Sequence, residues 1–222
     1  MKFYEAYNAE YYSERITNKS KKHMIKYMKF LRKGSSSLKM LDVGCGEGYY
    51  VRDAMEEGIN AYGIDISTHG LENALAEVKD RITFGSITEI PFADEEFDVM
   101  TAFDVIEHIH PKDTSNMVEE IRRVLKPDGI VIITTPNSNF GSWVFDLTHI
   151  NVRPPRFWKL IFQEHDFEVK MFYVPSFLKY YMKNHIPVPD SIEFVVEEPF
   201  RYILGRYYAR KARLYLVAKK PR

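Results

Sequence analysis

The sequence predicts an α/β protein built on a doubly wound, mostly parallel sheet. Between residues 38 and 137, five strand-like segments occur, and helical segments follow most of them. This alternation is typical of parallel sheets whose crossover helices cover both faces. Two local features agree with it: a glycine-rich turn separates the first strand from its helix, and the second strand ends in an aspartate, Asp65. Both are expected of an α/β fold that binds a nucleotide.

Each core element is predicted from the spacing of its apolar residues. Strands are expected at residues 38–43, 61–64, 81–84, 97–103 and 130–135, and helices at 49–57, 67–79 and 117–125. Ser67 or Thr68 is suited to cap the second helix. The run Lys126-Pro127-Asp128-Gly129 is expected to end the third helix, because proline cannot continue it.

The remaining chain is expected to cover this core within one domain, residues 1–222. We divide it into an N-terminal helical lid (1–37), a cofactor-binding core (38–137), a substrate-covering region (138–209) and a final strand (210–222). Within the third part, a helix is predicted at 155–165, a strand at 167–174 and an insertion at 175–209. Residues 213–219 alternate in polarity, as a last strand does.

Composition places the chain among ordinary globular proteins. Of 222 residues, 45% are hydrophobic and 28% are charged, and the formal net charge is zero, so overall charge does not favour nucleic acid. The single cysteine, Cys45, excludes an internal disulfide and suits a reducing compartment. We find no signal pattern and no apolar run of the ~18 residues that span a bilayer. We therefore expect a cytoplasmic protein, with at most weak surface association through its basic C-terminus. The oligomeric state stays open.

The glycine-rich turn, Asp42-Val43-Gly44-Cys45-Gly46-Glu47-Gly48, carries the functional prediction. Glycines let the backbone turn at positive φ and let a ligand lie against the main chain. Asp65 follows about 20 residues later, where a carboxylate accepts the hydroxyls of a ribose. Together these residues predict a nucleoside site.

The spacing of the glycines indicates which nucleoside. Dinucleotide-binding folds use G-x-G-x-x-G, whereas here the order is D-x-G-x-G-x-G and Tyr49 stands where the last glycine would be. This pattern resembles the first motif of class I S-adenosylmethionine (SAM) methyltransferases. The resemblance implies a seven-stranded sheet closed by an antiparallel strand, and SAM as the cofactor.

The resemblance also implies which residues bind SAM. Asp42 is expected near the amino-acid end, with the glycine loop beneath it, and Ser86 at the adenine, where many relatives have aspartate. An aromatic residue of the lid, Tyr7, Tyr11 or Tyr12, is a candidate for the methionine end. The full expected set is Asp42, Gly44, Cys45, Gly46, Gly48, Asp65, Ile66, Ser86, Ile87, Phe103, Asp104 and Tyr12.

Two further runs indicate the branch of the family. Residues 91–99 read PF-x-D-x-x-FDV and residues 103–109 read Phe-Asp-Val-Ile-Glu-His-Ile, which resemble the small-molecule branch. Within it the chain is similar to ubiquinone-biosynthesis O-methyltransferases and to sugar or glycan methyltransferases. The implied acceptor is a hydroxyl oxygen of a small molecule, with an amine as the alternative.

A hydroxyl acceptor needs a base, and histidine suits that task near neutral pH. His149 lies in a D-x-x-H run after the fifth strand and is our candidate catalytic base; the other interpretation is that it only holds a lid loop. For His108, packing is the favoured interpretation. We expect no metal site, because the acidic residues near the mouth lack ligand spacing.

Other functions fit less well. The chain lacks the N/D-P-P-Y motif of amino-methylating nucleic-acid enzymes after the fourth strand, and its only cysteine is not placed as a cytosine-C5 nucleophile. NAD-dependent oxidation would need the other glycine spacing. A non-catalytic SAM-binding scaffold remains open.

Overall fold

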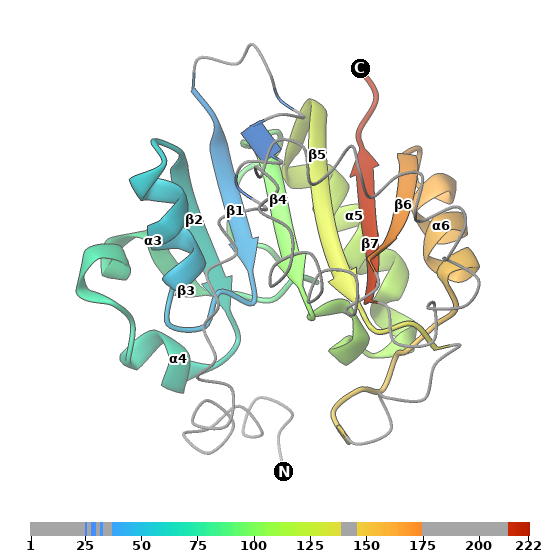
Figure 1. Ribbon diagram of the computed structural model, residues 1–222, viewed down its shortest axis with the longest axis horizontal. Coiled ribbons are helices and arrows are strands. Elements are labelled where there is room, and N and C mark those ends of the chain that lie inside the picture. The colour runs from blue at the N-terminus through green and yellow to red at the C-terminus, as the bar shows by residue number, and fades with distance from the viewer. Residues whose placement is uncertain (1–24, 26–27, 30–31, 33–36, 139–145, 175–212) are drawn as a thin grey trace, which may run out of the picture.

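The computed structural model describes residues 25, 28–29, 32, 37–138, 146–174 and 213–222. These form a seven-stranded sheet of order β3-β2-β1-β4-β5-β7-β6 (Figure 1). The strands are β1 (Lys39–Val43), β2 (Asn60–Asp65), β3 (Ile82–Phe84), β4 (Phe97–Phe103), β5 (Leu125–Thr135), β6 (Glu168–Val174) and β7 (Arg213–Lys219). β1 to β5 pair in parallel, and β7 runs antiparallel to β5 and β6. The predicted fold class is confirmed, including the antiparallel last strand.

Helices cover both faces of the sheet and bury two apolar cores. The helical elements are α3 (Tyr49–Glu56), α4 (Thr68–Glu72), η2 (Ala76–Arg81), η3 (Ile106–His108), η4 (Pro111–Asp113), α5 (Thr114–Val124) and α6 (Pro155–Glu164). One core joins the strands to α5 and α6, where Trp158 and Phe162 are fully buried. The other joins them to α3 and to Ile25 and Met28 of the N-terminal segment.

The order of the strands reverses at β1, which fixes where a ligand can bind. The chain moves from β1 to β2 and β3 on one side, then returns to β4 on the other. The loops leaving β1 and β4 therefore diverge and open a crevice at the carboxyl ends of these strands. In Figure 1 the arrowheads of β1, β4 and β5 all point to this lower edge.

Two predicted boundaries were wrong. The helix expected at 67–79 is two pieces, α4 and the 3-10 helix η2, although Ser67 caps α4 as predicted by accepting from Gly70 N at 3.2 Å. The run 126–129 does not separate α5 from β5, because β5 begins at Leu125 directly after the helix. Asp128, at φ 63°, absorbs the turn within β5, and the pairing with β4 shifts register there.

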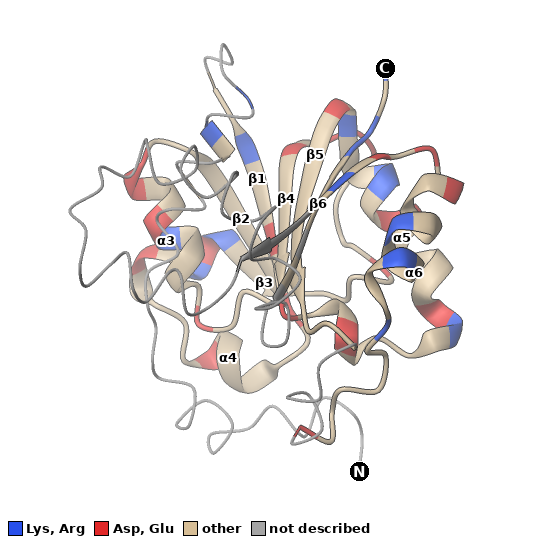
Figure 2. Cartoon of the chain, turned by 45° about the vertical axis from the view of Figure 1, so that its right-hand side comes forward, with Lys and Arg blue, Asp and Glu red and all other residues tan. Residues whose placement is uncertain are grey.

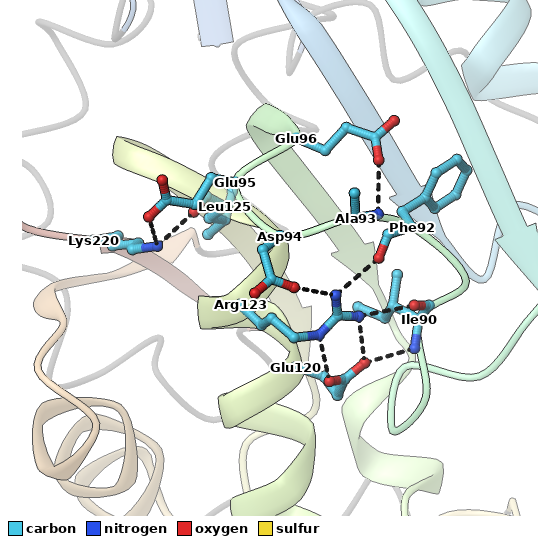
Figure 3. A network of polar contacts seen from close by, with 10 residues as sticks. All are labelled: Ile90, Phe92, Ala93, Asp94, Glu95, Glu96, Glu120, Arg123, Leu125 and Lys220. Carbon is cyan, nitrogen blue, oxygen red and sulfur yellow. Dashed lines mark hydrogen bonds and ion pairs between the residues drawn. The ribbon is translucent and has the colours of Figure 1, made fainter.

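Ion pairs and side-chain hydrogen bonds hold the opposite, amino-terminal edge of the sheet (Figure 3). Arg123 of α5 contacts Glu120 at 2.7 Å and Asp94 at 2.8 Å, and donates to the carbonyl groups of Ile90 and Phe92. These contacts raise the pKa of Arg123 and lower that of Glu120. The PF-x-D-x-x-FDV run, quoted above as typical of a family, thus ties a loop to a helix far from the crevice.

Charged residues are concentrated on the helices and at the strand ends, whereas the strands at the centre are mostly uncharged (Figure 2). Basic and acidic residues both occur on α3, α5 and α6. Among the described residues, no helix combines the length and the hydropathy that a bilayer crossing requires.

Candidate active site

The glycine loop turns sharply between β1 and α3 and is fixed to the end of β2. Gly44, Gly46 and Gly48 have φ values of 73°, 54° and 84°. The N–H groups of Gly44 and Cys45 both donate to Ile64 O, at 2.9 and 3.1 Å. A Cβ on Gly44 would lie 2.5 Å from Val105 Cγ2. Glycine is therefore required here by both conformation and space.

Asp65 closes the loop from the other side. Its Oδ2 accepts from Gly46 N and its Oδ1 from Ser67 N, both at 2.7 Å, and the residue is 8% exposed. Burial raises the pKa of this carboxyl, while the N–H groups of Ser67, Gly46 and Ile66 oppose that shift. A carboxylate oxygen can accept more than one hydrogen bond, so Asp65 keeps acceptor capacity for a ribose.

Asp42 lies in β1 just before the same loop, and β4 holds it. Thr101 Oγ1 donates to Asp42 Oδ1 at 2.6 Å, and both residues are buried. Nearby, the rings of Tyr50 and Phe103 pack edge to face, 5.2 Å apart. Burial, Asp42 and Asp53 together raise the pKa of Tyr50, which keeps its hydroxyl protonated. The pKa of Cys45 is raised mainly by burial, so its thiol is not a ready nucleophile.

Ser86, the residue expected at the adenine, and the expected cofactor residues Ile66 and Ile87 follow the ends of β2 and β3. Ile66 is half-buried, and Ile87 is buried in the core. Ser86 Oγ lies 2.7 Å from Thr88 Oγ1 and accepts from Thr88 N at 3.2 Å. The serine therefore forms a local turn with Thr88.

Asp104 follows β4 at a strained position, φ 59°. Its N–H donates to Thr134 O at 2.8 Å, and its Oδ1 accepts from Thr134 Oγ1 at 3.1 Å. A non-glycine residue with positive φ at the end of a central strand is held by its surroundings. Phe103 and Asp104 thus lie at the carboxyl end of β4, on the side of the crevice.

His149 lies against the turn that follows β4. Its ring centroid is 4.8 Å from that of His108, and its Nε2 is 3.4 Å from Asp146 Oδ2. Glu107, the residue before His108 in this turn, is fully buried and accepts from Thr135 Oγ1 at 3.0 Å. One nitrogen of each histidine and one oxygen of Glu107 all lie within 4.8 Å of one another.

Sequence reasoning missed Glu107 and Asp146 as parts of this site. Glu107 stands inside the run 103–109, and a carboxylate directly before a histidine was the available signal. A carboxylate with two imidazoles is a donor set that divalent transition metals accept, so these three residues could hold a cation. The expectation of no metal site stays a prediction. Tyr7, Tyr11 and Tyr12 lie outside the described residues.

Comparison with known proteins finds a family that the core of the chain resembles. Residues 41–133 match the family described as a methyltransferase domain, from β1 to β5. This part of the chain is therefore similar to a methyltransferase domain. The match includes the glycine loop, Asp65 and the end of β4. The resemblance to class I SAM methyltransferases, read from these residues, is confirmed.

Curated relatives include O-methyltransferases. The chain is 30% identical over 129 residues to a ubiquinone biosynthesis O-methyltransferase of Histophilus somni, covering 54% of this chain and 53% of the relative. A protein with the same description from Pseudomonas aeruginosa is 30% identical over 125 residues, covering 51% of each. The chain spans about half the length of the curated relatives it matches.

Solved structures agree on the fold. Phosphoethanolamine N-methyltransferase 2 of Haemonchus contortus, solved with S-adenosyl-L-methionine, is similar with a TM-score of 0.64 and 22% identity, covering 90% of this chain and 52% of that one. A SAM-dependent methyltransferase of Archaeoglobus fulgidus has a TM-score of 0.64 and 19% identity, covering 88% and 91%. At these identities the likeness concerns the fold.

Proposed function

We propose that this protein is an enzyme that moves a methyl group from SAM to a hydroxyl oxygen of a small molecule. The observation that carries the proposal is the hydrogen bond from Gly46 N to Asp65 Oδ2, at 2.7 Å. It holds the open main chain of the glycine loop and a buried carboxylate side by side at the switch point of the sheet. A nucleoside with a charged amino-acid tail fits both parts.

The proposal gives bound SAM one orientation along the described residues. Asp65 would accept the ribose hydroxyls, Ile66, Ser86 and Ile87 would border the adenine, and the loop 44–48 would lie beneath the amino-acid tail, near Asp42. Phe103 and Asp104 would border the methionine part. Bound SAM supplies a methyl group on a sulfonium, ready for in-line displacement. The protein's part is to align the acceptor and exclude water.

His149 is our candidate for the base. As the acceptor oxygen bonds to the methyl carbon and the carbon–sulfur bond breaks, the hydroxyl proton would pass to a ring nitrogen of His149. Asp146, 3.4 Å from the ring, would stabilise the imidazolium that forms. The region 138–209 would cover the acceptor. A small amine as acceptor remains the second candidate, since the similar Haemonchus contortus structure is an N-methyltransferase.

Calorimetric titration with S-adenosylhomocysteine, with NAD and NADH as controls, tests the cofactor. We expect micromolar or tighter binding of S-adenosylhomocysteine alone. Binding of NAD instead would overturn the proposal. If S-adenosylhomocysteine binds but no labelled methyl group is transferred from SAM to any hydroxyl or amine acceptor, the protein would be a non-catalytic SAM-binding scaffold. The lone buried Cys45 supports a cytoplasmic location as part of the same proposal.

A further inference from the structure

The loop that carries His149 is attached to the turn η3 at both ends. Thr148 is the residue before His149, and its carbonyl oxygen lies 3.1 Å from His108 Nδ1. On the other side, Asn151 N donates to the backbone oxygen of Glu107 at 2.8 Å. Two successive residues of η3 therefore hold the chain immediately before and shortly after His149.

The same loop is ordered from within. Thr148 donates to Asp146 Oδ1 through both its N–H, at 3.0 Å, and its hydroxyl, at 2.5 Å. Asn151 is 1% exposed and donates through its side chain to Thr114 Oγ1 at 3.1 Å. The His149 backbone therefore has little freedom, and what remains to be fixed is its ring.

The His108 ring is placed to do this. It is 6% exposed, and it meets the His149 ring at an interplanar angle of 60°. A carbonyl oxygen only accepts hydrogen bonds, so Nδ1 of His108 must carry the proton toward Thr148 O. In the neutral ring this leaves Nε2 as the acceptor, which fixes one tautomer.

We propose that His108 is a positioning residue that sets the His149 ring at the mouth of the site. It acts through the hydrogen bond to the Thr148 carbonyl and the contact between the two rings. This inference rests on the proposed function, in which His149 receives the proton. A small displacement of a catalytic group can reduce turnover about 100-fold, so its positioning has a measurable effect.

Two substitutions separate positioning from packing. H108N keeps an N–H donor close to the place of Nδ1, whereas H108F keeps a ring but removes the donor. We expect H108F to lower kcat by ~10- to 100-fold with the KM for SAM unchanged, and H108N to recover most of that loss. The matched control is H165F. His165 also pairs its Nδ1 with a carbonyl, Ile161 O at 2.8 Å, but at the end of α6, and this change should leave kcat unaltered.

Nitrogen-15 spectra of the imidazoles test the same inference without methyl transfer, so it can fail separately from the proposed function. We expect the Nδ1–H tautomer for His108, and altered His149 resonances in H108F but not in H165F. A wild-type kcat in H108F, equal losses in both His108 variants, or an Nε2–H tautomer would each overturn the proposal. Thermal unfolding of every variant checks that it is folded.

Discussion

Acidic residues at the amino-terminal edge of the sheet face lysine and arginine, whereas those at the carboxyl-terminal edge face N–H groups, hydroxyls and imidazoles. At the first edge, Asp98 meets Lys126 at 2.9 Å, and Asp128 meets Lys219 at 2.7 Å and Arg222 at 2.6 Å. At the second, Asp42 accepts from Thr101 and Asp65 from two backbone N–H groups.

The pKa values of the carboxyl groups at the two edges shift in opposite directions. Hydrogen bonds from Lys219 and Arg222 lower the pKa of Asp128 to about 2, whereas burial raises the pKa of Asp65. A carboxylate neutralised by a cation has little left to offer a ligand. One held by neutral donors keeps its charge and part of its acceptor capacity. Under the proposed function, the first edge serves stability and the second serves binding.

The largest expected effect is at His149. H149A should reduce turnover ~10²–10⁴-fold if the ring is the base, while the affinity for S-adenosylhomocysteine changes little. Steady-state kinetics beside calorimetry measure the two effects separately. Normal turnover in H149A would show that this histidine has only a structural role. It would also contradict the assignment of the carboxyl-terminal edge to catalysis.

Asp65→Ala should have the next largest effect. Loss of hydrogen bonds to a charged group costs ~1.5–3 kcal/mol, which corresponds to about 10- to 150-fold weaker binding of S-adenosylhomocysteine by calorimetry. Asp80→Ala removes an exposed acid before β3 and serves as the control. Unchanged affinity in the Asp65 variant would contradict the cofactor assignment.

Asp98→Ala should show the opposite behaviour. Its carboxylate accepts from Lys39 N and Lys126 Nζ, both at 2.9 Å, within a nearly buried site. We expect the free energy of unfolding to fall by ~1.5–3 kcal/mol and the melting temperature by about 3–12 °C, with cofactor affinity retained. Exposed Glu164→Ala is the control. A loss of affinity in the folded Asp98 variant would mean that the edges are coupled.

Acid titration of the wild-type protein should distinguish the two edges, because binding and stability should be lost at different pH values. Since the pKa of Asp65 is raised, its carboxylate is lost as pH falls through a value above the ordinary ~3.9 of aspartate, and binding should weaken with it. The pKa of Asp128 is lowered, so its contribution to stability is present above ~3.9 and is lost only as pH falls toward about 2. Calorimetry and thermal unfolding across this range should therefore show binding failing first. Simultaneous loss would contradict the assignment.

The smallest expected effect is that of metal removal. Following the expectation of no metal site, dialysis against a chelator should leave methyl transfer unchanged. Inductively coupled plasma analysis of the purified protein checks the same point. A stoichiometric divalent cation, absent from Glu107→Gln, would instead assign the cluster of Glu107, His108 and His149 to metal binding.

The sequence by itself determined the strands, the glycine loop and Asp65, because each depends on neighbours along the chain. Alternating or continuous apolar runs gave β4 (97–103) and β7 (213–219) their observed bounds. Glycine is the residue that adopts positive φ without steric cost, so three glycines at alternate positions made the loop predictable. Local propensity was less reliable where packing competes, as in the split of the helix expected at 67–79.

Only the tertiary structure decided how distant residues meet. Glu107 and His108 are far from His149 in sequence. Nothing in their spacing predicts that the turn η3, which contains the first two residues, holds the loop that contains His149. Likewise, the PF-x-D-x-x-FDV run is as regular as the glycine loop, yet it lies at the opposite edge and binds Arg123. The physical reason is that parallel strands bring together loops from far along the chain, and only the sheet order says which loops share an edge.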